Sequence, residues 1–427
     1  ANIDPSVDFP RGGIMNCAQP GRVDRFPWPV AYGDGPVFSD FNAGSSTWIG
    51  AEFDDTRREL YALVNWNDPA HTNISTLVAW NVDTGARRVV SGIYPDSVAG
   101  EMEYGSGYES PTTFVSDAAG ATQPLTSVDA IRLHEGVLSA ASQHEILRVD
   151  PLTGERSILW RRQDQALTGE LTSTYGQCFR PSHLGVRDGL ELEAHSFAVG
   201  STGEFYRGFR DVRGGSGVLR ISADASECTV LARWNGRGDV APDPSNSVPP
   251  PPDVGSGYLP NPLTAQVRGM LVFDGRLYAV MSGDLVAMDL TTGERVRVDD
   301  TNLPYPAGYT SMFYDPNREV IWSSGATAAI FGNVIVDPAT GQKEQLVNDS
   351  GRTDYPGEAI LDSVYPGGGS AANTGGGATS NNNGTQLGGV VVDPRNADIA
   401  YGVTVVGGLI EMELSTFNNY IRSWGQH

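Results

Sequence analysis

Five side chains of the kinds that do chemistry stand near the beginnings of short predicted strands. They are Asp129, Glu193, His195, Arg268 and Tyr309. Carboxylates and a histidine can hold a divalent cation or accept a proton, and an arginine can stabilise a developing negative charge. If the strands begin at one end of a shared channel, the five side chains meet at its mouth. An ordinary solvated rim with compensating charges would use the same residue types.

In the chemical interpretation, Asp129, Glu193 and His195 are metal ligands or a general base, and one divalent metal ion is the cofactor they would take. Arg268 would then stabilise negative charge, and Tyr309 would orient a substrate. No spacing motif supports the set, because the six histidines show no HExxH pattern. The sequence also shows no P-loop, no nucleophile elbow or dinucleotide fingerprint in a strand–turn–helix context, and no EF-hand loop.

The elements that must position these residues come from a repeat. Six nine-residue windows line up, each opening with a mostly apolar strand, and they begin at Leu77, Ile146, Val218, Leu285, Asn333 and Leu409. A second strand precedes each window, as in ELYALV from Glu59 and GRLYAV from Gly275. Before that second strand comes an inner strand that ends in a turn. Asp, Pro, Thr and Gly in and between the strands supply tight hairpin turns.

Six repeats of four short antiparallel strands predict an all-β fold, a six-bladed β-propeller of four-stranded blades. A single sheet of this kind cannot bury both faces, whereas blades stacked radially in a closed ring can. We expect one domain over residues 47–427 and an extended N-terminal segment, residues 1–46, that wraps the ring. The last blade could take its outer strand from NNYIRSW near the C-terminus, and GPVFSDF from Gly35 could add a strand to a blade.

Long connections interrupt the repeats at about 93–125, 162–190, 235–263 and 348–386. Structureless segments of this length are uncommon in compact domains and tend to be functional or disordered. Several of the connections carry tyrosines, which suit contact with a protein or a glycan. The same tyrosines could instead pin a connection to the ring.

The charge balance, the apolar runs and the cysteines of the chain limit which partners and which cross-links it can have. The chain has 51 acidic against 29 basic residues and a net charge of −22, which argues against nucleic acid or an anionic membrane surface as the partner. No apolar run approaches the ~20 residues that cross a bilayer. Cys178 and Cys228 could form a disulfide, and Cys17 would be left over or could pair with either.

The first residues after Ala1 have neither the charged nor the apolar region of a signal peptide. A mature secreted protein would begin in this way, although an engineered start would look the same. We expect an extracellular or periplasmic location.

The recurring strand–LYAV–strand–VDPxTGE pattern covers about residues 47–424. It resembles the bacterial secreted six-bladed propellers, a class that includes NHL-like, TolB-like and gluconolactonase-like proteins. The resemblance implies a fold that many unrelated activities share. Gluconolactonase-like enzymes hold a divalent metal in the channel with a Glu, an Asn and an acidic residue, and the acidic candidates here are Asp129 and Glu193.

Two functions remain open. The first is a non-enzymatic binding scaffold that presents its loops to a protein partner, a glycan or copies of itself. The second is a channel-mouth enzyme, a metal-assisted hydrolase or lactonase. A scaffold should keep its binding after Asp129→Ala and His195→Ala but lose it when 93–125 or 348–386 is shortened, and an enzyme should do the reverse.

Overall fold

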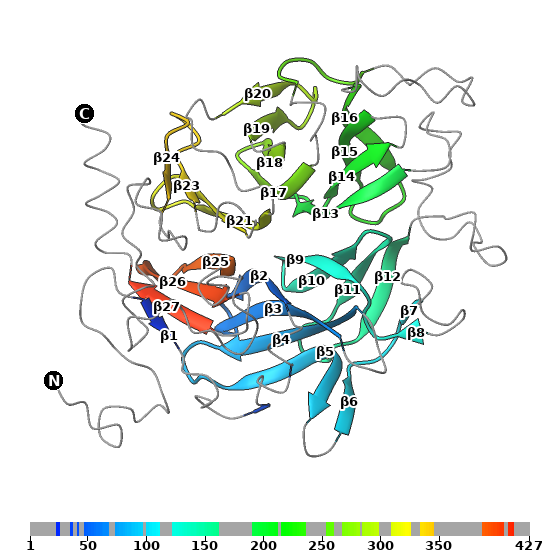
Figure 1. The fold of residues 1–427 in the computed structure, drawn as a ribbon, viewed down its shortest axis with the longest axis vertical. Coiled ribbons are helices and arrows are strands. Elements are labelled where there is room, and N and C mark those ends of the chain that lie inside the picture. The colour runs from blue at the N-terminus through cyan, green and yellow to red at the C-terminus, as the bar shows by residue number, and fades with distance from the viewer. Residues whose placement is uncertain are drawn as a thin grey trace, which may run out of the picture.

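A computed structural model of the chain shows an arrangement built of β-strands (Figure 1). No helix in the part of the chain that it describes is long and apolar enough to cross a membrane. The residues described are 23–25, 35–36, 41, 47–67, 73–96, 100–111, 122–161, 190–211, 215–235, 253–259, 267–281, 284–298, 309–325, 334–345, 387–404 and 409–413.

Five antiparallel sheets of the described residues have four strands each, and a further sheet has five. We number these sheets 1 to 6 in chain order. Sheet 1 is the five-stranded one, so the predicted uniform count of four strands is wrong there. Its strands are β2 (Thr47–Asp54), β3 (Glu59–Trp66), β4 (Ile74–Asn81), β5 (Arg87–Asp96) and β6 (Gly100–Tyr104).

Sheets 2 to 4 each run outward through consecutive hairpins. Sheet 2 contains β9 (Val128–His134), β10 (Val137–Ser142), β11 (Glu145–Val149) and β12 (Arg156–Arg161). Sheet 3 contains β13 (Leu190–Val199), β14 (Phe205–Asp211), β15 (Gly215–Ile221) and β16 (Cys228–Asn235). Sheet 4 contains β17 (Val267–Phe273), β18 (Arg276–Met281), β19 (Asp284–Asp289) and β20 (Arg295–Arg297).

Sheet 5 follows the same pattern, and sheet 6 combines strands from both ends of the chain. Sheet 5 contains β21 (Tyr309–Asp315), β22 (Val320–Gly325), β23 (Val334–Val336) and β24 (Lys343–Gln345). Sheet 6 contains β25 (Leu387–Asp393), β26 (Asn396–Thr404), β27 (Leu409–Glu413) and β1 (Val23–Arg25). A small separate pair consists of β7 (Ser110–Pro111) and β8 (Thr122–Gln123).

The innermost strands pack side by side around a common axis. They follow one another as β2, β9, β13, β17, β21 and β25, and β25 packs back against β2 (Figure 1). Sheets that radiate from such a circle of innermost strands form a β-propeller. The predicted all-β propeller is therefore confirmed at the level of fold.

Hydrophobic clusters fill the spaces between neighbouring sheets. Ile49 and Tyr61 of sheet 1 pack with Ile131 and Leu138 of sheet 2, and all four are buried. Because both faces of a sheet meet a neighbour, strands such as β3 and β4 are buried along almost their whole length. This explains why they read as nearly continuous apolar runs.

The windows of the repeat end in the hairpin turns that the sequence predicts. Asp289 shows the geometry, since its Oδ1 accepts hydrogen bonds from the backbone N–H of Thr291 at 2.9 Å and of Thr292 at 2.7 Å. Gly293 then closes the turn with a φ of 68°. Asp150 and Asp337 accept the same pair of bonds in sheets 2 and 5.

The outer strand of sheet 6 comes from the N-terminal part of the chain. β1 pairs antiparallel with β27, with Val23 opposite Met412 and Arg25 opposite Ile410. The sequence anticipated NNYIRSW in this place, but its residues, 418–424, lie outside the described part of the chain, and β1 takes the position. Most of GPVFSDF also lies outside it.

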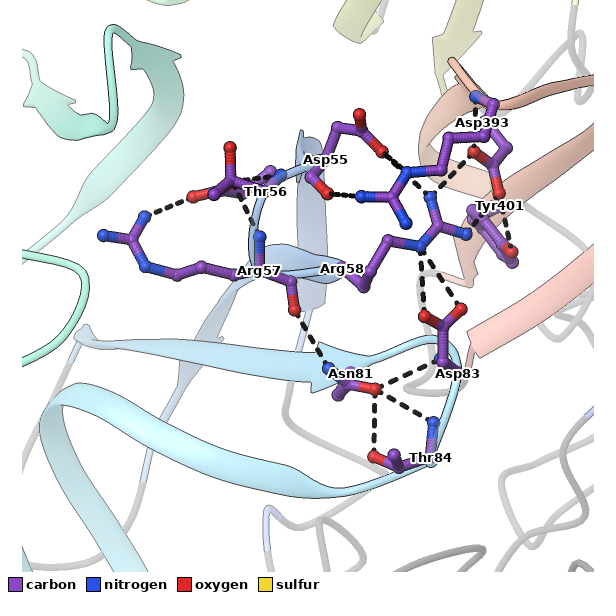
Figure 2. A network of polar contacts seen from close by, with 11 residues as sticks. Asp55, Thr56, Arg57, Arg58, Asn81, Asp83, Thr84, Asp393 and Tyr401 are labelled. Carbon is purple, nitrogen blue, oxygen red and sulfur yellow. Dashed lines mark hydrogen bonds and ion pairs between the residues drawn. The ribbon is translucent and has the colours of Figure 1, made fainter.

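Sheets 6 and 1 are joined by a polar network centred on Arg58 (Figure 2). Its guanidinium donates to both carboxylate oxygens of Asp393, at 2.8 and 2.5 Å, and also contacts Asp55 and Asp83, each at 3.2 Å. The side chains of Arg58 and Asp393 are only 12% and 4% exposed. A buried charge pair thus connects residues 335 positions apart in the sequence.

Cys228 forms no disulfide with another described residue, and its predicted bridge to Cys178 stays a prediction. It opens β16, and its side chain packs against the hydrophobic cluster between sheets 2 and 3, which includes Trp160 and Phe197. Its predicted partner Cys178 and the third cysteine, Cys17, lie outside the described residues.

Candidate functional site

A bulge of four residues in β13 displaces two of the predicted site residues, Glu193 and His195, from the regular pairing with β14. The pairing of β13 with β14 jumps from Leu192 to Phe197, so that residues 193–196 bulge out. His195 within the bulge has a φ of 59°, a left-handed conformation that costs energy for a residue with a Cβ. Bulges re-aim side chains and are frequent beside functional sites.

Asp129, at the beginning of β9, lies against this bulge. The Nδ1–H group of His195 donates to the backbone oxygen of Asp129 at 2.8 Å, which leaves Nε2 as the acceptor of the neutral ring. The Asp129 carboxylate is 9% exposed, and its Oδ1 lies 3.4 Å from Nη1 of the fully buried Arg207. Its other oxygen, Oδ2, is buried and has no hydrogen-bond partner among the described residues.

The other predicted site residues also lie on innermost strands. Glu193 belongs to the bulge and is buried, with 8% of its surface exposed. Arg268 stands at the second position of β17, opposite Val280, and Tyr309 begins β21, where its backbone pairs with Gly325. The structure therefore places all five near the beginnings of their strands or, for the two in β13, in its bulge.

The structure does not gather the three predicted metal ligands into a metal centre. In the described ranges, no group of three or more His, Cys, Asp or Glu side chains lies close enough to hold a metal ion. His195 turns Nδ1 toward a carbonyl, and Asp129 turns one carboxylate oxygen toward Arg207, so these atoms are engaged within the protein. The acceptor that this arrangement leaves for a ligand is His195 Nε2, because the second Asp129 oxygen is buried.

An ion pair that sequence reasoning missed links three innermost strands. Arg132 of β9 donates from Nη1 to Glu52 of β2 at 3.1 Å and from Nη2 to the carbonyl of Met270 in β17 at 2.9 Å. Burial raises the pKa of Glu52, although the charge of Arg132 and the hydrogen bond from Leu133 N–H oppose the shift. Both charges lie in mid-strand positions without any motif, which is why the sequence did not single them out.

A second missed feature, which we call the GSGY clamp, holds two of the long connections. Residues 105–108 and residues 255–258 both read Gly-Ser-Gly-Tyr. The tyrosine N–H of each donates to the backbone oxygen of a buried arginine that opens an outer strand, Arg156 at 2.9 Å or Arg295 at 2.8 Å. Each arginine Nε donates back to the tyrosine carbonyl, at 2.8 and 3.0 Å.

The clamp requires glycine because the two backbones touch. A Cβ added at Gly107 would lie 2.2 Å from the Arg156 oxygen, and one at Gly257 would lie 2.1 Å from the Arg295 oxygen. Both arginines are 2% exposed, and burial lowers the pKa of each. The connections at 93–125 and 235–263 are therefore tied to the ring at these points. The repeated tetrapeptide was the available sequence signal, but it falls between the windows of the repeat.

The first clamp lies at the base of a two-stranded arm, which we define as residues 92–96 and 100–104. β5 pairs with β4 only as far as Ser91 and then continues alongside β6. Figure 1 shows β6 and the end of β5 extending outward from the ring. The first four residues of β6 are exposed, and Met102 keeps 40% of its surface in solvent.

The base of the arm is fixed by contacts with sheet 2. Arg156 donates from Nη1 to the carbonyl of Tyr104 at 3.1 Å and from Nη2 to the carboxylate of Glu103 at 3.3 Å. The ring of Tyr94 packs edge-on against Tyr104 and against the buried Phe41. The arm thus leaves the ring from an ordered base.

Comparisons with known proteins identify no family for this chain. No family model matches it, and no curated protein is similar enough to match. A solved structure assigned to the gluconolactonases is 11% identical over 95% of both chains, with a TM-score of 0.44. A chain of a mitotic checkpoint complex is 12% identical over 93% of this chain and 96% of its own, with a TM-score of 0.43.

Regucalcin, a calcium-binding protein from Agrobacterium tumefaciens, is 10% identical to this chain. The match covers 86% of this chain and 89% of that one, with a TM-score of 0.40. Similarity at this level does not identify a function, which must come from the residues themselves.

Proposed function

We propose that the protein is a non-enzymatic binding scaffold that presents the arm of sheet 1 to a protein partner. The observation that carries this proposal is the arm itself, in which β6 lies at the end of the five-stranded sheet and is exposed along its first four residues. Exposed sheet edges invite pairing with another chain unless they are shielded. In the proposed scaffold the six sheets are the blades of one closed ring.

An ordered base favours binding through the arm. A flexible hairpin would lose conformational entropy when a partner immobilised it, whereas a fixed one has already lost it on folding. Arg156 and the rings of Tyr94 and Tyr104 restrict the arm where it leaves sheet 1. The clamp therefore contributes to affinity although it does not touch the partner.

Site-specific photo-crosslinking in the native host tests the proposal. A photo-reactive residue replaces Met102 in the arm or, as the matched control, Leu152, which is 65% exposed on a turn of sheet 2. We expect one discrete protein adduct from position 102 and none of that mass from position 152. No adduct from position 102, or the same adducts from both positions, would contradict the proposed function.

A channel-mouth hydrolase or lactonase is the second candidate, and the bulge of β13 is the observation that favours it. A strained His195, whose Nδ1–H donates to the Asp129 backbone oxygen and whose Nε2 is the acceptor of the neutral ring, can act as a general base. A panel of esters and lactones tests this function. Hydrolysis by the purified protein that disappears in His195→Gln would support it, and a rate unchanged by the substitution would exclude this base.

A further inference from the structure

The outer strand of the arm carries a charge pattern that specifies its partner. Side chains alternate between the faces of a strand, so Glu101 and Glu103 share one face of β6 and Met102 lies on the other. Glu103 contacts the buried Arg156 at 3.3 Å yet is 50% exposed, and it can still face a partner. In the described part of the chain, β6 pairs with β5 and with no further strand.

Building on the proposed function, we propose that β6 binds an extended basic segment of a protein partner, which adds a strand to sheet 1. Strand addition uses backbone hydrogen bonds for affinity and alternate side chains for specificity. Lysine or arginine opposite Glu101 and Glu103 gives favourable cross-strand pairs, and an apolar residue between them meets Met102. The preferred segment therefore alternates basic and apolar residues.

A second copy of this chain fits the edge poorly. Antiparallel self-pairing centred on Met102 would set Glu101 of one copy opposite Glu103 of the other, and like charges directly opposite are destabilising. The chain also carries a net charge of −22, so two copies repel each other at low salt. The same charge draws a basic segment toward the protein, and salt screens that attraction.

Two labelled peptides of equal charge test the inference by fluorescence anisotropy with the purified full chain at low salt. One reads Thr-Lys-Val-Lys-Val-Lys-Thr, and the other has proline in place of both valines, which removes backbone donors and prevents strand pairing. We expect the valine peptide to bind about tenfold more tightly than the proline peptide, a difference typical of a few cross-strand pairs.

Two charge-reversal variants locate the binding. Glu101→Lys should weaken binding of the valine peptide about fivefold, because it sets like charges opposite each other. The matched control is Glu155→Lys, which makes the same change in net charge at an exposed turn of sheet 2 and should have a much smaller effect. Equal binding of the two peptides, or equal losses in the two variants, would show attraction to the whole protein and overturn the inference.

The two tests separate the inference from the function on which it rests. A specific adduct from position 102 without preference for the valine peptide would leave the scaffold standing and remove the basic strand. Preference for the valine peptide without any adduct in the host would support the chemistry of the edge and contradict its use in the proposed function.

Discussion

Replacing Arg58 with methionine should weaken the junction between sheets 6 and 1. Arg58 donates to both oxygens of Asp393, and the two side chains are 12% and 4% exposed. Methionine keeps an apolar stem of similar length but removes the charge. The Asp393 carboxylate would retain hydrogen bonds from Arg395 N–H at 2.9 Å and from the Tyr401 hydroxyl at 3.2 Å.

The expected cost follows from the burial of the pair. Removing one partner of a buried ion pair costs about 3–5 kcal/mol, because the remaining charge is left without its counter-charge. An unfolding entropy of about 2.1 cal/mol/K per residue amounts to roughly 0.9 kcal/mol/K for a chain of this length unfolding as one unit. Arg58→Met should therefore lower the Tm by about 3–6 °C.

The stability lost in Arg58→Met should become smaller at low pH. Burial opposes ionisation of Asp393, but the hydrogen bonds and charge of Arg58 outweigh it and lower the Asp393 pKa. A carboxyl group with a depressed pKa stabilises the fold above its unfolded pKa, about 3.9, and that contribution disappears as the pH falls through the folded pKa. The Tm difference between the two proteins should therefore narrow below about pH 4.

Arg395→Met is the matched control for thermal melts recorded by circular dichroism. Arg395 contacts Asp55 at 2.7 Å, but the two side chains are 55% and 45% exposed. Removing this pair should therefore lower the free energy of unfolding by no more than about 1 kcal/mol. Equal Tm values for the two variants would refute the role assigned to Arg58. If the Tm of Arg58→Met stays equally far below that of the wild type at pH values under about 4, the role of Asp393 ionisation is refuted.

Three further variants or measurements test other parts of the structure. Arg156→Met should release the base of the arm, and limited proteolysis should then cut at residues 92–104 faster than in the wild type. Because burial raises the pKa of Glu52, its ionisation costs stability, so the wild-type Tm should fall relative to Glu52→Gln as the pH rises from about 4 to 7. We retain the prediction that Cys178 and Cys228 form a disulfide in an oxidising compartment, and linked peptides in a non-reducing map would detect it and support an extracellular or periplasmic location.

The repeat could be predicted because its signals are local. Each window contains the turn residues that close its own hairpin, as the bonds to Asp289 show. The outer strand of sheet 6, β1, could not be placed in the same way. It is distant in sequence from its partner β27, and neither strand carries a turn that fixes their pairing. The fifth strand of sheet 1 was hidden in a connection that showed no window of the repeat.

The candidate sites show the same division between local and distant signals. Aligning the inner strands set Asp129 and His195 near the strand beginnings, but it could not foresee the bulge in β13 or the hydrogen bond from His195 to the Asp129 backbone carbonyl. The Glu52–Arg132 pair depends on which strands face each other, which no short motif encodes. The GSGY clamp was visible as a repeated tetrapeptide, although its buried arginine partners follow only from the fold.

Hydrogen exchange of the β6 amides tests the central claim most directly. The purified protein is compared alone and with a saturating concentration of the alternating lysine–valine peptide, and exchange is followed by mass spectrometry. We expect slower exchange over Gly100–Tyr104 and no change over the equally regular strand Asp284–Asp289. Protection confined to other strands, or none at all in β6, would contradict the assignment of this edge as the binding surface.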